Sequence, residues 1–139
     1  MIKGSNLIGR SVVDMDAAEK LGKVKEIIVQ QDGERVAGFV VAHAANILGS
    51  GGTRRSIPAS ALNAIGPDAI TVHGHGVAEE ATRELDSLPR MSDVIGRKMM
   101  TQSGRLLGTI DDLLINPTDG SIIGFPIGED IKSKLENMF

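Results

Sequence analysis

The sequence predicts an all-β protein with short helices, in which a small β-barrel is duplicated and the second copy is incomplete. Three observations predict this fold class. A segment near the N-terminus recurs in the second half, both halves place Asp-Gly between runs of β-branched residues, and the chain holds 17 Gly against 5 Pro. Asp-Gly between such runs is a strong hairpin signal, because both residues tolerate positive φ. With 139 residues, the chain has room for one domain or two very small ones.

The internal repeat covers most of both halves. The first copy begins SNLIGR at 5–10 and the second begins SDVIGR at 92–97, with four identities in six positions. Further on, LGKVKEIIV at 21–29 runs parallel to LGTIDDLLI at 107–115. The expected organisation is a first module at 1–76, a linker helix at 77–90 and a partial second module with a C-terminal helix at 91–139.

The strands of the first module follow from its β-branched runs. Residues 24–29 and 36–41 flank the Asp-Gly pair without a clean alternation of apolar and polar side chains, which predicts bulged, curling strands. Gly38 and Gly124 lie at matching places inside strands. A glycine there indicates that another backbone or a large side chain approaches closely. We therefore expect the two glycines to have equivalent surroundings.

The rest of the first module is read from turn and helix signals. Residues 46–55 contain a Gly-Ser-Gly-Gly run, which predicts a mobile loop or a long hairpin tip. Residues 59–65 predict one helical turn, and the run AITV at 69–72 predicts a closing strand. Between 77 and 88 the apolar residues take helical spacing, and Pro89 ends the predicted linker helix.

Five stretches occur in a fixed order: IGR at 8–10, LGKVKEIIV at 21–29, VAGFVV at 36–41, SIP at 56–58 and IGPDAITV at 65–72. In this order and spacing they resemble the PRC-barrel family, the small β-barrel of the cytoplasmic domain of the photosynthetic reaction centre H subunit. The C-terminal domain of a small-subunit ribosome maturation factor is related. The resemblance implies a scaffold that binds protein partners and brings no catalytic residues.

Composition excludes several classes of protein. The chain has no Cys, which removes disulfide frameworks, thiolate metal sites and thiol nucleophiles. Three Phe, no Trp and no Tyr leave almost no stacking platform for nucleotides, and a net charge of -3 does not attract nucleic acid. The longest apolar stretch, 36–42, is too short to span a membrane, and the N-terminus lacks a signal-peptide pattern. We expect a cytoplasmic protein without a nucleic-acid partner.

Histidines and arginines supply the candidate ligand sites. His73 and His75 lie two residues apart on one side of a strand end, and His43 is a candidate third metal ligand. A solvated strand end is the favoured alternative, so we expect the first two to be exposed and unligated. Arg54 and Arg55 follow the glycine-rich run as in a phosphate cradle, but the Lys-Ser/Thr ending of a nucleotide loop is absent, which favours a hairpin tip.

No residues form a recognisable catalytic group. Asp111 and Asp112 are adjacent on a predicted strand, so they point to opposite faces and are expected to be exposed carboxylates. No serine lies in a nucleophile-elbow pattern. We therefore expect no enzymatic activity and no cofactor. The predicted function is a protein-interaction or assembly module. A small-ligand or metal-binding regulatory protein is the alternative, and an RNA-processing or ribosome accessory factor ranks below it.

The second module has no counterpart for residues 56–58 or 69–72, because Phe139 aligns near Thr53. Its barrel cannot close, so an apolar face is expected to be uncovered. Three covers are open: the first module, the second module of another copy, or a C-terminal extension. We expect a homodimer, with an unidentified further protein partner. The residues assigned to this interaction are Ile110, Leu113, Ile115, Ile123, Phe125, and, in a tail with helical spacing, Ile131, Leu135 and Phe139.

Overall fold

The structure is a computed structural model that describes residues 1–43, 54–73 and 79–128, of which 79–82 are described by their backbone alone. Most of the predicted glycine-rich loop, His75 and the predicted C-terminal helix lie outside the described residues.

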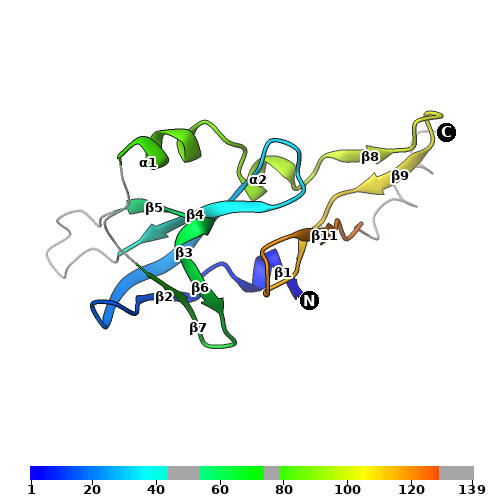
Figure 1. Ribbon diagram of the computed structural model, residues 1–139. Coiled ribbons are helices and arrows are strands. Elements are labelled where there is room, and N and C mark those ends of the chain that lie inside the picture. Colours follow the sequence, from blue (N-terminus) through cyan, green and yellow to red (C-terminus); the bar gives the residue numbers. More distant parts are fainter. Residues whose placement is uncertain (44–53, 74–78, 129–139) are drawn as a thin grey trace, which may run out of the picture.

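The described chain is mostly β-strand, with four short helices (Figure 1), as the sequence predicts. The elements in chain order are β1 (Ile2–Lys3), η1 (Gly4–Asn6), β2 (Ser11–Asp14), β3 (Glu19–Val29), β4 (Val36–Ala42), β5 (Arg54–Pro58), η2 (Ala59–Ala61), β6 (Leu62–Ile65), β7 (Ala69–Val72), α1 (Glu79–Asp86), α2 (Met91–Val94), β8 (Lys98–Met100), β9 (Leu106–Thr109), β10 (Leu114–Ile115) and β11 (Ile122–Gly124).

A six-stranded sheet of order β5-β4-β3-β2-β7-β6 forms the body of the molecule. Its neighbours are antiparallel except β2 and β7, which run parallel from Ser11 opposite Ala69 onward. The register between β3 and β4 shifts twice, once at Val24/Glu26 and once at Ile28/Val29. These bulges confirm the predicted curling, because an extra residue on one strand bends it and increases its twist.

The curled sheet encloses one apolar core to which both halves of the chain contribute. Phe39 and Ile27 from the first half and Leu113 and Ile115 from the second are all fully buried in it. On the outer face of β4, α1 packs Leu85 against a smaller buried cluster. The predicted linker helix therefore exists, and it covers one face of the first half.

One element of the first half differs from its prediction. Residues 59–65 form a single turn of 3-10 helix, η2, followed by strand β6, and not a helical turn throughout. Leu62 lies opposite Val72 and Ile65 opposite Ile70. The three-residue spacing of Leu62 and Ile65 is typical of a helix, but their pairing with β7 makes them part of a strand.

The backbone geometry of the first half recurs in the second. Gly9 and Gly96 have φ of 87° and 89°, and Gly22 and Gly108 have φ of 141° and 156°. The N–H of Gly9 donates to the Val24 carbonyl at 2.8 Å, and the N–H of Gly96 donates to the Ile110 carbonyl, also at 2.8 Å. The same local bonds therefore follow from the repeated sequence.

Gly38 and Gly124 occupy the same place in the strand register, opposite Ile28 and Leu114 respectively. Their surroundings nevertheless differ, so this prediction is wrong. A Cβ on Gly38 would collide with the Ile57 carbonyl of β5, whereas a Cβ on Gly124 would meet no atom within 4 Å. The reason is that no described strand takes the place of β5 beside β11.

The two halves exchange their first extended segments. Strand β1 pairs with β10 of the second half, with Lys3 opposite Leu114. In return, Arg90, which precedes the second half, bridges Ile28 of β3. Figure 1 shows β1 (blue), near the N-terminus, in the same small sheet as β11 (orange), with β10 between them.

The hairpin turns of the two halves also bond to each other reciprocally. The N–H of Val36 donates to the Gly120 carbonyl at 2.9 Å, and the N–H of Ile122 donates to the Glu34 carbonyl at 2.8 Å. These residues match pairwise in the repeat. The two turns are thus joined by a reciprocal pair of backbone hydrogen bonds.

Candidate interaction surface

The apolar face that the sequence predicts to be uncovered is largely buried. Leu113 and Ile115 are 0% exposed, and Ile110 is also buried. All three residues are buried, so the prediction is wrong for them. Leu113 and Ile115 are covered by the first half of the same chain, because β1 crosses over and pairs with β10. Ile110 instead bridges Ile127 of the second half. Of the remaining predicted contacts, Ile131, Leu135 and Phe139 lie outside the described residues.

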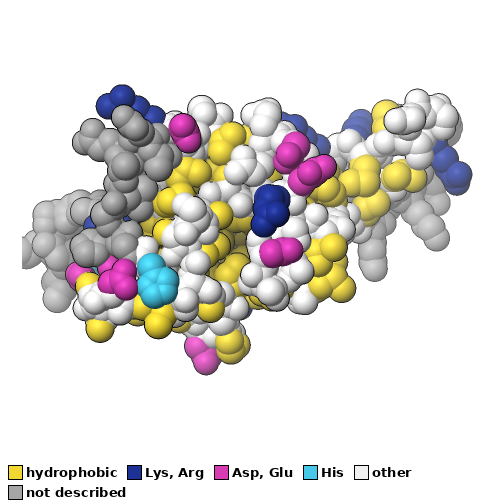
Figure 2. Space-filling model, in the orientation of Figure 1, with side chains coloured by type: hydrophobic (Ala, Val, Ile, Leu, Met, Phe, Trp, Pro, Cys, Tyr) yellow, Lys and Arg dark blue, Asp and Glu magenta, His cyan; other side chains and the backbone are white. Residues whose placement is uncertain are grey.

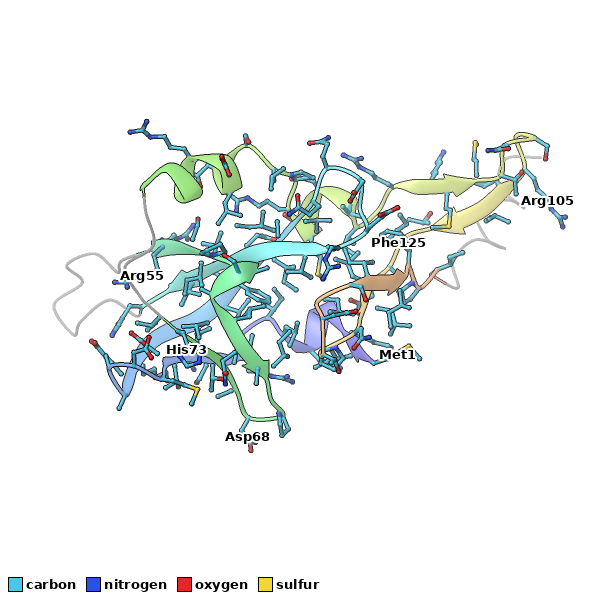
Figure 3. All side chains as sticks on the ribbon, viewed as in Figure 1. Met1, Arg55, Asp68, His73, Arg105 and Phe125 are labelled. Carbon is cyan, nitrogen blue, oxygen red and sulfur yellow. The ribbon has the colours of Figure 1, made fainter. Side chains whose placement is uncertain are left out.

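Within the described residues, the outer edge of β11 and of the segment that follows it, 125–128, stays open. Ile123 is 51% exposed and Ile127 is 39% exposed, while Phe125 is half-buried (Figure 3). The carbonyl of Pro126 accepts the N–H of Asp111 at 2.8 Å. This bond joins the inner edge of the segment to the residues between β9 and β10. Its outer edge faces no strand within the described ranges.

The corresponding edge of the first half is covered. Strand β5 pairs along β4, with Phe39 opposite Ile57 and Val41 opposite Arg55. Helix α1 covers the outer face of the same strands through Leu85. Among the described residues, β11 of the second half has neither a counterpart of β5 nor a counterpart of α1.

The β8–β9 hairpin is the other exposed part of the second half. It projects from the body of the molecule in Figure 1, and apolar side chains gather on it in Figure 2. Met100 is 58% exposed and Leu107 is 43% exposed. In the first half, the matching strand β2 is covered by β7.

The two predicted phosphate ligands, Arg54 and Arg55, are exposed on β5 (Figure 3 labels Arg55). They line an open pocket of about 430 Å³ together with two further cations, Lys25 and Arg90. The Nη1 atom of Arg90 is buried and has no hydrogen-bond partner among the described residues, and its Nη2 lies 3.8 Å from Asp86 Oδ1. The adjacent arginines can be found from the sequence, but the two further cations cannot. Lys25 is brought to the pocket by the pairing of β3, β4 and β5, and Arg90 by the segment after α1, which bridges Ile28 of β3.

The predicted metal ligands do not converge in the described part of the chain. His73 is exposed, as expected, and both of its ring nitrogens have partners: Nδ1 lies 3.0 Å from Asp16 Oδ1 and Nε2 lies 3.1 Å from Asn63 Oδ1 (Figure 3). His43 is exposed, and His75 lies outside the described residues. Within the described ranges, no three His, Asp or Glu side chains form a group that could hold a metal ion.

The prediction of two exposed carboxylates is half wrong. Asp111 is exposed, but Asp112 is buried and accepts the N–H of Ser5 at 3.0 Å as well as the Ser5 hydroxyl. Glu26, its counterpart in the repeat, accepts the N–H of Ser92 at 3.3 Å. Each carboxylate thus holds the beginning of the other half. The recurrence of this serine in both copies indicates an equivalent role, but the sequence does not indicate that each serine bonds to the opposite half.

One carboxylate at the junction of the halves has a perturbed pKa. The hydroxyl of Ser121, then its backbone N–H, hydrogen-bond to Asp119 and lower the pKa of that carboxyl below its ordinary 3.8. The Arg35 guanidinium acts in the same direction, and it also donates to the Asp119 carbonyl at 2.7 Å. The carboxylate of Asp119 thus bonds within its own turn, and the bond across the two turns is the one from Arg35 to the Asp119 carbonyl.

No helix in the part of the chain that the structure describes is long and apolar enough to cross a membrane. A comparison with the curated proteins gives no match. The model of the PRC-barrel domain matches residues 1–76, which is more than half of the chain. The protein therefore belongs to the PRC-barrel domain family.

Proposed function

We propose that the protein is a non-catalytic protein-interaction and assembly module, which self-associates through its incomplete second half. The observation that carries the proposal is the unequal covering of matching strands. β4 and β2 of the first half are paired on both edges, whereas β11 and β8, their counterparts, have no outer neighbour among the described residues. Unpaired strand edges are templates for pairing with another chain.

Side-chain exposure supports the same surface. Large apolar residues that remain exposed in the second half include Met100, Leu107, Ile123 and Ile127. Proteins commonly protect an open edge with charged residues, but the segment 122–128 reads IIGFPIG and carries none. The recurring backbone geometry supports the view that the second half is a copy of the first.

Light scattering on a sizing column tests the proposal. A species of twice the chain mass is expected at concentrations on the order of tens of micromolar, since edge pairing between short strands buries less than a standard interface. The dimer should dissociate on dilution. A strict monomer across this concentration range would contradict self-association.

A second candidate function is binding of a small anion, which the pocket beneath Arg54 and Arg55 favours. Lys25 and Arg90 add two further positive charges to its lining, against Glu26 and Asp86. Calorimetric titration with inorganic phosphate, comparing the wild type with R55Q, tests this function. Binding that weakens in R55Q supports it, and heat that is equal in the two proteins argues against it.

A further inference from the structure

The outer edge of residues 125–127 is ready to accept a strand. The Pro126 carbonyl accepts the N–H of Asp111 at 2.8 Å, and the N–H of Gly128 donates to the Thr109 carbonyl at 2.9 Å. Alternate residues of an antiparallel strand direct their polar groups to opposite sides. The N–H and C=O of Phe125 and Ile127 therefore face outward.

These outward groups are unpaired within residues 1–43, 54–73 and 79–128. Phe125 and Ile127 match Phe39 and Val41, whose outer edge is occupied by β5. The proline does not block the edge, since its missing N–H belongs to the inner side. The segment thus offers a place for one antiparallel strand.

We propose that a second copy of this chain occupies the edge, with residues 125–127 of the two copies paired antiparallel about a twofold axis at Pro126. In this register, Phe125 of each copy lies opposite Ile127 of the other, and every outward N–H and C=O of these residues finds a partner. The pairing is isologous, as closed dimers require. The inference rests on the proposed self-association and names its contact.

Side-chain chemistry favours a second copy over a partner of different composition. Residues 125–127 are uncharged, and Pro126 has an apolar residue on each side, so the segment presents the same pattern to an antiparallel copy of itself. Cross-strand pairs of aromatic and β-branched residues are among the favourable ones in sheets. Ile123, which is 51% exposed beside the edge, gains cover from the same contact.

A cross-linking experiment tests the register. The two Pro126 residues would form a pair without mutual hydrogen bonds, with Cα atoms about 4.5 Å apart. A disulfide spans Cα separations of about 4.4–6.8 Å. Because the chain has no Cys, P126C provides a single thiol. Mild oxidation should convert P126C into a covalent dimer, whereas M15C, a control at a methionine of the first half that is 49% exposed, should cross-link much more slowly.

A second variant tests the hydrogen bonds. I127P removes an outward N–H and leaves the inner bonds of Pro126 and Gly128 in place, so the fold should survive, as a thermal melt would verify. The dissociation constant of its dimer should rise about tenfold or more, whereas I127V should match the wild type. If the wild type is a dimer but I127P dimerises equally well, or P126C does not cross-link, this register alone is wrong. A monomeric wild type overturns the proposed self-association as well.

Discussion

Replacement of Leu113 by Ala should destabilise the whole chain and not only its second half. Leu113 is 0% exposed and lies in the core that both halves share. Truncation of a fully buried leucine removes its transfer free energy and leaves a cavity, at a cost of about 2–5 kcal/mol. Domains of this size are stable by only about 5–15 kcal/mol. L113A should therefore lose a large part of the free energy of unfolding.

Urea denaturation provides the assay, and Leu107 provides the matched control because it lies in the same half and is 43% exposed. L113A should lower the urea midpoint and the melting temperature, the latter by roughly 10 °C for about 3 kcal/mol. L107A should cost less than about 1 kcal/mol, since most of its surface is already in water. A single transition is expected in every protein. Equal losses in the two variants, or two separate transitions in the wild type, would refute a shared core.

Three other predictions concern backbone and electrostatic details. G38A should lower the free energy of unfolding, measured by urea denaturation, by about 1–3 kcal/mol because the new methyl group meets the β5 backbone. G124A places its methyl group in open space and should change this free energy by less than about 1 kcal/mol. Equal effects would contradict the difference between the two sites. D112A should cost about 1–3 kcal/mol because it leaves buried N–H groups unpaired, and a melt indistinguishable from the wild type would argue against this. S121A should raise the pKa of Asp119 toward 3.8 in a carboxyl NMR titration. In the wild type, the lowered pKa stabilises the fold above pH 3.8, and this contribution disappears as the pH falls through the lowered value; an unchanged titration in S121A would contradict the assignment.

Several features of the fold are local enough to be read from the sequence. The Asp-Gly turns, the bulged strands and the closing strand β7 all follow from residues within a few positions of each other. Gly38 was identified as a point of close approach, and the Ile57 carbonyl is what approaches it. Such features depend on φ preferences and on strand periodicity, which neighbouring residues determine.

The candidate sites depend on contacts between distant residues, and here the sequence is less informative. Arg54 and Arg55 are adjacent in sequence, but Lys25 and Arg90 join them only through the sheet and the segment after α1. Asp112 is expected to be exposed on strand alternation, yet it is buried because it binds Ser5, which is 107 residues away. Local periodicity contains no information about such a partner.

The sequence by itself determined the β class and the segments that recur in its two halves. The tertiary structure decided how the incomplete half is covered. Pairing of β1 with β10 buries Leu113 and Ile115 within the chain, whereas Ile123 and Ile127 beside the β11 edge stay exposed among the described residues. The β8–β9 hairpin is exposed as well, at Met100 and Leu107. The physical reason is that two similar hairpins have similar edges, so each first strand can pair within its own half or with the other. The choice between these partners depends on the free energy of the whole assembled core, not on any local segment.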